Sequence, residues 1–139
     1  MIALVITALV AIEAIGIMVV EVFGSTPQQA KAFELKPEIV DIPEVKTLLG
    51  NQGVYNGLLG VLIFATMFLL SGQQQVLMLS LEMGFILIAA IYGSLTAARK
   101  IILVQGLPAA IALLALLLKE VLKTTLHVVM LFLFRINPC

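Results

Sequence analysis

The sequence predicts an all-α integral membrane protein, an up-down bundle of four transmembrane helices with a long loop between the first two helices. Of its 139 residues, 62% are hydrophobic and only 12% are charged, whereas soluble domains are about half apolar and about a quarter charged. A chain of this size cannot bury so much apolar surface in its own core, so lipid has to cover it. A membrane span needs about 20 mostly apolar residues, and four segments are close to this length. The short links after the second and third segments favour antiparallel neighbours.

The first span is predicted at residues 1–23, interrupted only by Glu13 and Glu21. A cleaved signal peptide is the rival interpretation of this segment. No Lys or Arg precedes Lys31, and a signal peptide needs a basic start and a shorter apolar stretch. We therefore expect a retained span.

The long loop is predicted at residues 24–50. Residues 25–27 (STP) are typical of a helix start, with a capping residue followed by proline at the first helical position. The spacing of Asp41 and Glu44 fits a capping box, so the second helix is expected to begin near Pro43. The loop contains apolar side chains, and two alternatives are open. Either the loop covers the bundle end or lies on the bilayer, or it is a solvated loop.

Three further spans are predicted at residues 54–70, 76–97 and 101–118, so the four-span domain covers residues 1–118. A C-terminal extension, residues 119–139, follows. Its most apolar part is too short to span a bilayer. The extension is expected to prolong the fourth helix, to lie in the membrane interface or to pack on a partner.

The distribution of basic residues predicts the orientation. The long loop and the link before the fourth span carry five Lys or Arg residues, and the extension on the other side carries three. Basic residues favour the cytoplasmic side. We therefore expect a multi-pass protein of the cell (inner) membrane with residues 24–50 in the cytoplasm.

Glu13 is the sharpest candidate for a functional group, because it lies near the middle of the first span. A charged side chain at that depth costs roughly 3 kcal/mol on insertion scales. Two interpretations have equal weight. In the first, Glu13 is a site for a proton, a cation or a ligand. In the second, it makes a structural hydrogen bond between helices. Glu82 lies near the opposite interface, where it is expected to reach water.

The larger polar side chains of all four spans fall in the half of the membrane next to the long loop. They predict a polar cavity that opens toward this loop with Glu13 at its floor, although helix ends are always more polar than helix centres. The candidate ligand-binding residues are Glu13, Glu21, Asn51, Gln52, Tyr55, Asn56, Tyr92 and Gln105.

Small residues and one proline predict where the helices pack. Gly53, Gly57 and Gly60 form a stripe along the second span that allows close helix approach. Gly93 and Pro108 are assigned to packing as well, because Pro108 lacks an amide hydrogen and frees a carbonyl one turn earlier.

No metal site, cofactor or nucleic-acid partner is expected. His127 has no His or Cys at ligand spacing, and the eight basic and eight acidic residues cancel. No nucleotide-binding loop, nucleophile elbow or zinc-protease motif occurs in the sequence.

Several short strings resemble a bacterial membrane family catalogued as domain of unknown function 1304. The most specific string is NQGVYNG at residues 51–57, and the likeness covers roughly residues 1–118 in the same order. The resemblance implies a small four-span protein and no particular activity. Members often carry His directly after the first Glu, where this chain has Ala14. The strings are at residues 12–14, 21–23, 51–57, 91–93 and 105–109.

Three classes of function remain open. The favoured one is small-molecule or ion handling through the polar intramembrane cavity. The second is a membrane-embedded enzyme that acts on a lipid-like substrate, which no motif supports. The third is a structural or accessory subunit, which contacts a second copy or another membrane protein through the glycine stripe and the extension. The lipid bilayer is a partner in all three.

Overall fold

The computed structural model describes residues 1–136, and every element over this range is helical. The elements in chain order are α1 (Ile2–Phe23), α2 (Thr26–Phe33), α3 (Pro37–Val40), α4 (Pro43–Leu69), α5 (Gly72–Thr96), the π-helix η1 (Ile102–Gly106) and α6 (Leu107–Ile136).

Four of these helical stretches are long and apolar enough to cross a membrane, with mean hydropathies from 1.5 to 2.6. Only 22% to 33% of the most apolar window of each stretch is buried inside the protein. The remaining apolar side chains need lipid around them, because the hydrophobic effect opposes their exposure to water. The prediction of an all-helical chain with four helices of this kind is confirmed. The stretches are Ile2–Phe23, Pro43–Leu69, Gly72–Thr96 and Ile102–Phe132.

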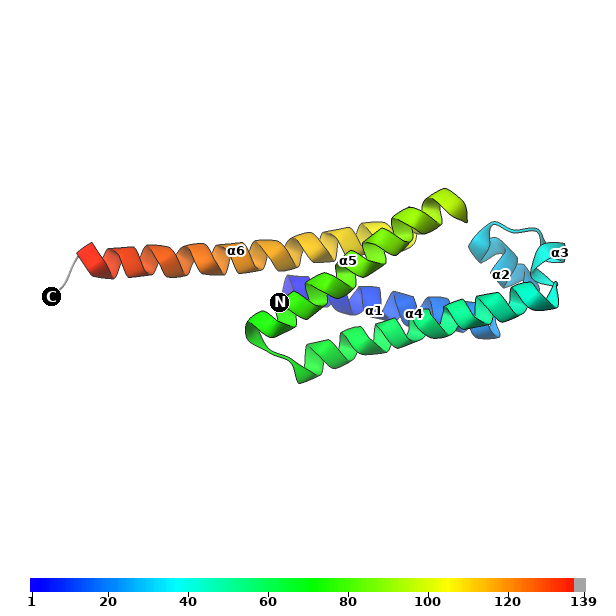
Figure 1. Ribbon diagram of the computed structural model, residues 1–139, viewed down its shortest axis with the longest axis horizontal. Coiled ribbons are helices and arrows are strands. Elements are labelled where there is room, and N and C mark those ends of the chain that lie inside the picture. Colours follow the sequence, from blue (N-terminus) through cyan, green and yellow to red (C-terminus); the bar gives the residue numbers. More distant parts are fainter. Residues whose placement is uncertain (137–139) are drawn as a thin grey trace.

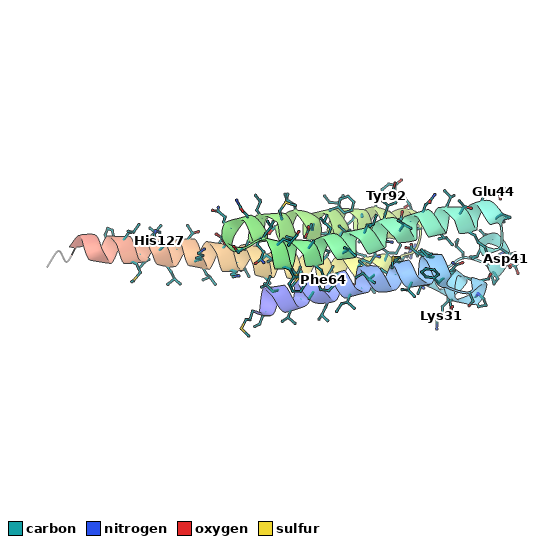
Figure 2. All side chains as sticks on the ribbon, turned by 90° about the horizontal axis from the view of Figure 1, so that it is seen from below. Lys31, Asp41, Glu44, Phe64, Tyr92 and His127 are labelled. Carbon is teal, nitrogen blue, oxygen red and sulfur yellow. The ribbon has the colours of Figure 1, made fainter. Side chains whose placement is uncertain are left out.

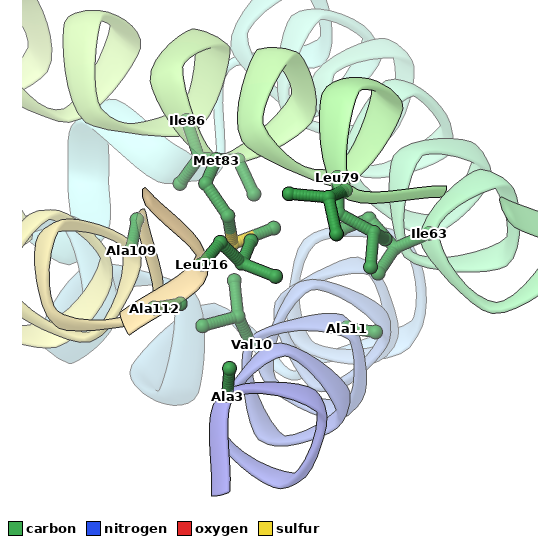
Figure 3. Close-up of a cluster of buried hydrophobic side chains, with 11 residues drawn as sticks. Ala3, Val10, Ala11, Ile63, Leu79, Met83, Ile86, Ala109, Ala112 and Leu116 are labelled. Carbon is green, nitrogen blue, oxygen red and sulfur yellow. The ribbon is translucent and has the colours of Figure 1, made fainter. Parts of the chain in front are cut away.

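The long helices form two closely packed pairs (Figure 1). α1 packs along α4, and α5 packs along η1 and α6. The pairs are joined by contacts of α1 with α6, while α4 and α5 touch little and diverge from their two-residue connection. A hydrophobic core lies where the pairs meet (Figure 3). All four long helices contribute to it, through Val10, Ile63, Leu79, Met83 and Leu116 among others.

Residues 24–42 fold over one end of the bundle. Ser25 and Gln28 form a reciprocal capping box that starts α2. Gln29 is buried and donates its Nε2 to the last carbonyls of α1, at 2.9 Å from the oxygen of Glu21. Lys100 Nζ, from the link before η1, lies 3.8 Å from Glu34 Oε1 and also bonds the Lys31 carbonyl. These contacts favour the first of the two alternatives, a segment that covers the bundle end.

Asp41 does not cap α4, so that part of the capping-box prediction is wrong. α4 begins at Pro43 with Ile42 as its N-cap and no side-chain bond at the cap. Instead, Asp41 Oδ1 accepts hydrogen bonds from Lys46 Nζ at 2.8 Å and from Thr26 Oγ1 at 2.6 Å. These bonds to the charged form hold the pKa of Asp41 below its ordinary value of 3.8. The carboxylate ties the start of α2 to the start of α4.

The π-helix η1 explains how the fourth span tolerates Pro108. Proline provides no amide hydrogen and clashes with the carbonyl four residues earlier. The chain widens over Ile102–Gly106, and the Leu107 amide bonds the Ile102 carbonyl, five residues back. Single π turns are frequent at functional sites because they change the direction of a side chain. Here Gln105 lies within the widened turn.

α6 extends well past the other helices (Figures 1 and 2). It has 30 residues, which at 1.5 Å per residue gives about 45 Å, more than the about 30 Å of a hydrocarbon core. The C-terminal extension therefore continues the fourth helix through residue 136. The apolar side chains of residues 121–132 are exposed, and His127 lies far from the end marked by Lys31 and Asp41 (Figure 2).

Candidate functional site

The glycine stripe of α4 brings this helix against α1. A Cβ built on Gly60 would lie 2.7 Å from the Ala11 carbonyl oxygen, and one on Gly53 would lie 2.8 Å from the Glu21 Cβ. Real Cβ atoms do not approach that closely, so only glycine permits this helix separation. The stripe fixes the position of α4 relative to the acidic residues of α1.

The close approach of α1 and α4 allows a part-buried hydrogen bond between them. Glu21 is 2% exposed, and its Oε2 accepts a hydrogen bond from Asn56 Nδ2 at 2.7 Å. A buried carboxyl group needs such a donor, because it has lost its contacts with water. Gly53 next to Glu21 leaves the space that the carboxyl group occupies. The most specific string of the sequence therefore supplies both the donor and the space.

A cavity of about 420 Å³ lies beside Glu13. Its wall is formed by α1, α4, α5 and η1, and it is mostly apolar. The Oε1 atom of Glu13 is buried and accepts no hydrogen bond. Buried polar atoms without a partner are rare in folded proteins, and each one calls for an explanation. The lining residues are Val10, Glu13, Ala14, Ile17, Gln52, Tyr55, Asn56, Leu58, Leu59, Leu62, Phe85, Ile86, Ala89 and Gln105.

The polar part of the wall consists of one carboxyl group, three amides and one phenol. Gln52, Tyr55 and Asn56 come from α4, and Gln105 comes from the π turn. None of the lining residues is Lys, Arg or His. The carboxyl group of Glu13 therefore has no cation of the protein beside it in the cavity.

Five of the eight candidate ligand-binding residues line one cavity, and three do not. Glu21 lies in the α1–α4 interface. There it accepts a hydrogen bond from Asn56, which itself lines the cavity. Asn51 and Tyr92 are exposed on the outer surface, Tyr92 by 70%. The five residues in the wall are Glu13, Gln52, Tyr55, Asn56 and Gln105.

The direction of the cavity differs from the one expected. No residue of 24–50 lines it, because α2 and α3 fold over that end. Its rim instead includes exposed apolar side chains of α4 and α5, among them Leu58 at 60% and Phe85 at 63%. These rim side chains come from α4 and α5, two helices that touch each other little.

Two further packing residues lie at the α5–α6 side. A Cβ on Gly93 would lie 3.3 Å from the Ile101 side chain, a contact tighter than most. Pro108 is half-buried just after the π turn. Neither residue lines the cavity.

Glu82 does not reach water as the sequence suggested. It is 5% exposed, and its Oε1 accepts a hydrogen bond from Thr66 Oγ1 of α4 at 2.7 Å. Its helix directs it toward α4 instead of the interface. The only signal in the sequence was a charge inside an apolar window, and nothing there indicated Thr66 as its partner.

The cavity wall holds few chemically reactive side chains. The groups in the wall that could act as an acid, a base or a nucleophile are the Glu13 carboxyl group and the Tyr55 phenol. No cluster of three or more His, Cys, Asp or Glu side chains able to hold a metal occurs among residues 1–136. Ala14, where the resembling family often has His, is part of the apolar wall.

Comparison with known proteins agrees with the resemblance seen in the sequence. The family described as "Protein of unknown function (DUF1304)" matches residues 8–117. The uncharacterised protein YpaA of Lactococcus lactis is 38% identical over 113 residues, which cover 81% of this chain and 93% of that relative. No solved structure matches the chain. The family match ends shortly before the exposed extension of α6. The chain belongs to the DUF1304 family.

Proposed function

We propose that this protein is a multi-pass membrane protein that binds a small molecule in the cavity beside Glu13. The single observation that carries the proposal is that Glu13, a residue in the wall of a cavity of about 420 Å³, has a buried Oε1 atom that accepts no hydrogen bond. A ligand that donates a hydrogen bond there would satisfy it. Ligand pockets are typically apolar with a few polar groups that fix the orientation of the ligand.

The contrast among the acidic residues of the long helices supports the proposal. Glu21 and Glu82 each accept a hydrogen bond from a neighbouring helix, as a structural carboxyl group does. Glu13 accepts none at Oε1. Glu82 Oε2 is also buried without a partner, but Thr66 donates to the other oxygen of Glu82, and Glu82 does not line the cavity as Glu13 does. An intramembrane acid without a partner inside the protein is, by default, a candidate for function.

We further propose the up-down topology predicted from the sequence, in the cell membrane, with residues 24–50 on the cytoplasmic side. The positive charges of Lys31 and Lys100 at one end support this orientation, because basic residues stay on the cytoplasmic side. The cavity would then lie within the membrane, nearer to the cytoplasmic half.

Native mass spectrometry of the protein released from detergent tests the proposal. We expect wild-type protein to retain one small molecule from its membrane. Ala89→Phe should abolish this retention, because Ala89 lines the cavity and a phenyl ring there would fill it. Leu95→Phe is the matched control on the same helix, at an exposed position outside the cavity. Equal retention by both variants would place the ligand elsewhere and contradict the proposal.

A second candidate, contact with a second copy or another membrane protein, is favoured by the α6 extension. The apolar side chains of residues 121–132, Leu122, Leu126 and Val129 among them, are exposed. Crosslinking in intact membranes tests it, with wild-type protein compared to a chain that ends at Leu118. A crosslinked species that is equally abundant without the extension would count against this role.

A further inference from the structure

The structure points to the ligand class and the entry route of the Glu13 cavity: we propose that an amphipathic amine enters sideways from the bilayer, between α4 and α5. This inference rests on the proposed function and makes it more specific. Three observations carry it, namely the apolar rim of the cavity, the charge of its wall and the arrangement of its polar and apolar groups.

The first observation is the apolar rim of the cavity between α4 and α5. α4 and α5 diverge from their short connection and make few contacts along their length. The rim between them is apolar and exposed, with Leu58 and Leu62 on one side and Phe85 on the other. At the other candidate entrance, α2 and α3 fold over the bundle end, and Gln29 is buried against the last turn of α1. A molecule dissolved in the bilayer therefore meets the cavity more directly than one in water.

The second observation is the charge of the wall. Glu13 is the only acidic residue in the lining, and no lining residue is basic. A charge inside a membrane needs an opposite charge next to it, because little solvent is present to screen it. A protonated amine supplies that charge and up to three hydrogen-bond donors. An alcohol would supply a donor but leave the carboxylate unbalanced, and an acid would place a second acidic group beside the first.

The third observation is the arrangement of polar and apolar wall groups. Gln52, Asn56 and Gln105 line the same cavity as Glu13, and amide oxygens are able to accept the remaining ammonium hydrogens. Leu59, Ile86 and the rim form an apolar compartment for a hydrocarbon or aryl body. Aromatic rings at Tyr55 and Phe85 border the same space and are able to pack against such a body.

A fluorescence experiment on the full chain in lipid nanodiscs tests the inference. The protein has no Trp, so Phe85→Trp introduces a single reporter at the cavity rim. The probe is para-bromophenylpropylamine, whose bromine quenches nearby indole. Its matched analogues are para-bromophenylpropanol and para-bromophenylpropanoate, which share the aryl body and differ in the head group.

We expect the amine to quench the reporter in a saturable way, with half-saturation at a concentration about tenfold lower than for the alcohol, a difference worth about 1.4 kcal/mol. Glu13→Gln in the reporter background should remove this preference. Glu82→Gln is the control, because Glu82 is a buried carboxyl group outside the cavity, and it should leave the preference intact. Methylammonium, which has no apolar body, should not displace the probe.

The outcomes separate this inference from the proposed function. Saturable quenching that is equal for all three probes and insensitive to Glu13→Gln would overturn recognition of the amine while leaving the cavity as a binding site. Displacement by methylammonium would overturn entry from the bilayer. Quenching that never saturates for any probe would overturn both the inference and the proposed binding function.

Discussion

The two faces of α4 differ in what they allow the neighbouring helix to do. On the face toward α1, Gly53, Gly57 and Gly60 carry no side chains, and the two helices pack closely along their length. On the face toward α5, large side chains such as Leu58 and Leu62 border a cavity. α4 therefore makes a closed interface with α1 and an open one with α5. The difference arises because the residues are glycines on the first face and leucines on the second.

The acidic residues of α1 follow the same division. Glu21 lies in the closed interface and has Asn56 as its donor. Glu13, about two turns earlier, lines the cavity, and its buried Oε1 has no hydrogen-bond donor. The comparison suggests that the closed interface serves folding and the open side serves binding. Each of the following changes tests one side of this division.

The largest effect is expected from Gly60→Leu in the closed interface. A Cβ there already approaches a backbone oxygen of α1 at 2.7 Å, and backbone cannot move aside as a side chain can. We expect a loss of about 3 kcal/mol in the free energy of unfolding, at the upper end for overpacking, measured by denaturation in mixed micelles. Gly16→Leu on α1 is the control, because no atom lies within 4 Å of its Cβ position. Equal losses for the two variants would contradict the tight α1–α4 contact.

Asn56→Leu should have the next largest effect, because it leaves the buried Glu21 carboxyl group without its hydrogen-bond donor. Loss of a partner from a buried polar group costs about 2 kcal/mol. The same denaturation experiment measures it. Asn51→Leu, at an exposed position of the same helix, should change stability little. A loss no greater for Asn56→Leu than for Asn51→Leu would show that the Glu21 bond does not hold the interface together.

Thr66→Val tests the contact of α4 with α5 near their connection. The substitution keeps the shape of the side chain and removes the donor to Glu82 Oε1. Because hydrogen bonds between membrane helices contribute about 0.6 kcal/mol on average, we expect a loss of that size. Unfolding of the double variant Thr66→Val with Glu82→Leu should show a smaller loss than the sum of the two single changes, since both remove one bond. Strict additivity would argue against that bond.

The smallest effect is expected outside the membrane, at Asp41. Its folded-state pKa lies below the ordinary value of 3.8, chiefly because of the bond from Lys46. The stabilisation is therefore present at neutral pH and is lost as the pH falls below 3.8 through the folded-state value. Asp41→Asn should accelerate amide hydrogen exchange in α2 and at the start of α4 at neutral pH, and should not do so at the acidic end. An effect that persists in acid would have another cause.

Much of the fold follows from patterns that a single sequence carries. The length and hydropathy of the spans, the glycine spacing of α4 and the proline that starts it are local features. The predicted capping by Asp41 was wrong because Lys46 and Thr26, at distances that a local rule does not consider, compete for its carboxylate.

The candidate site was predictable in content and less so in arrangement. Five polar residues expected to meet do line one cavity. Tyr92 and Glu82 were placed incorrectly because the directions of their side chains depend on how α5 is rotated about its axis. The periodicity of apolar residues does not specify this rotation when lipid surrounds an apolar helix. The opening between α4 and α5 depends on contacts between helices far apart in sequence, and no local pattern specifies them.

The most direct test of the division between folding and binding is the free energy of unfolding of Glu13→Leu, measured without ligand in mixed micelles. A carboxyl oxygen that is buried and unpaired weakens the folded state, and leucine removes this penalty. We predict stability equal to or higher than that of wild-type protein. A loss as large as that of Asn56→Leu would contradict the account, because Glu13 would then be a structural group like Glu21.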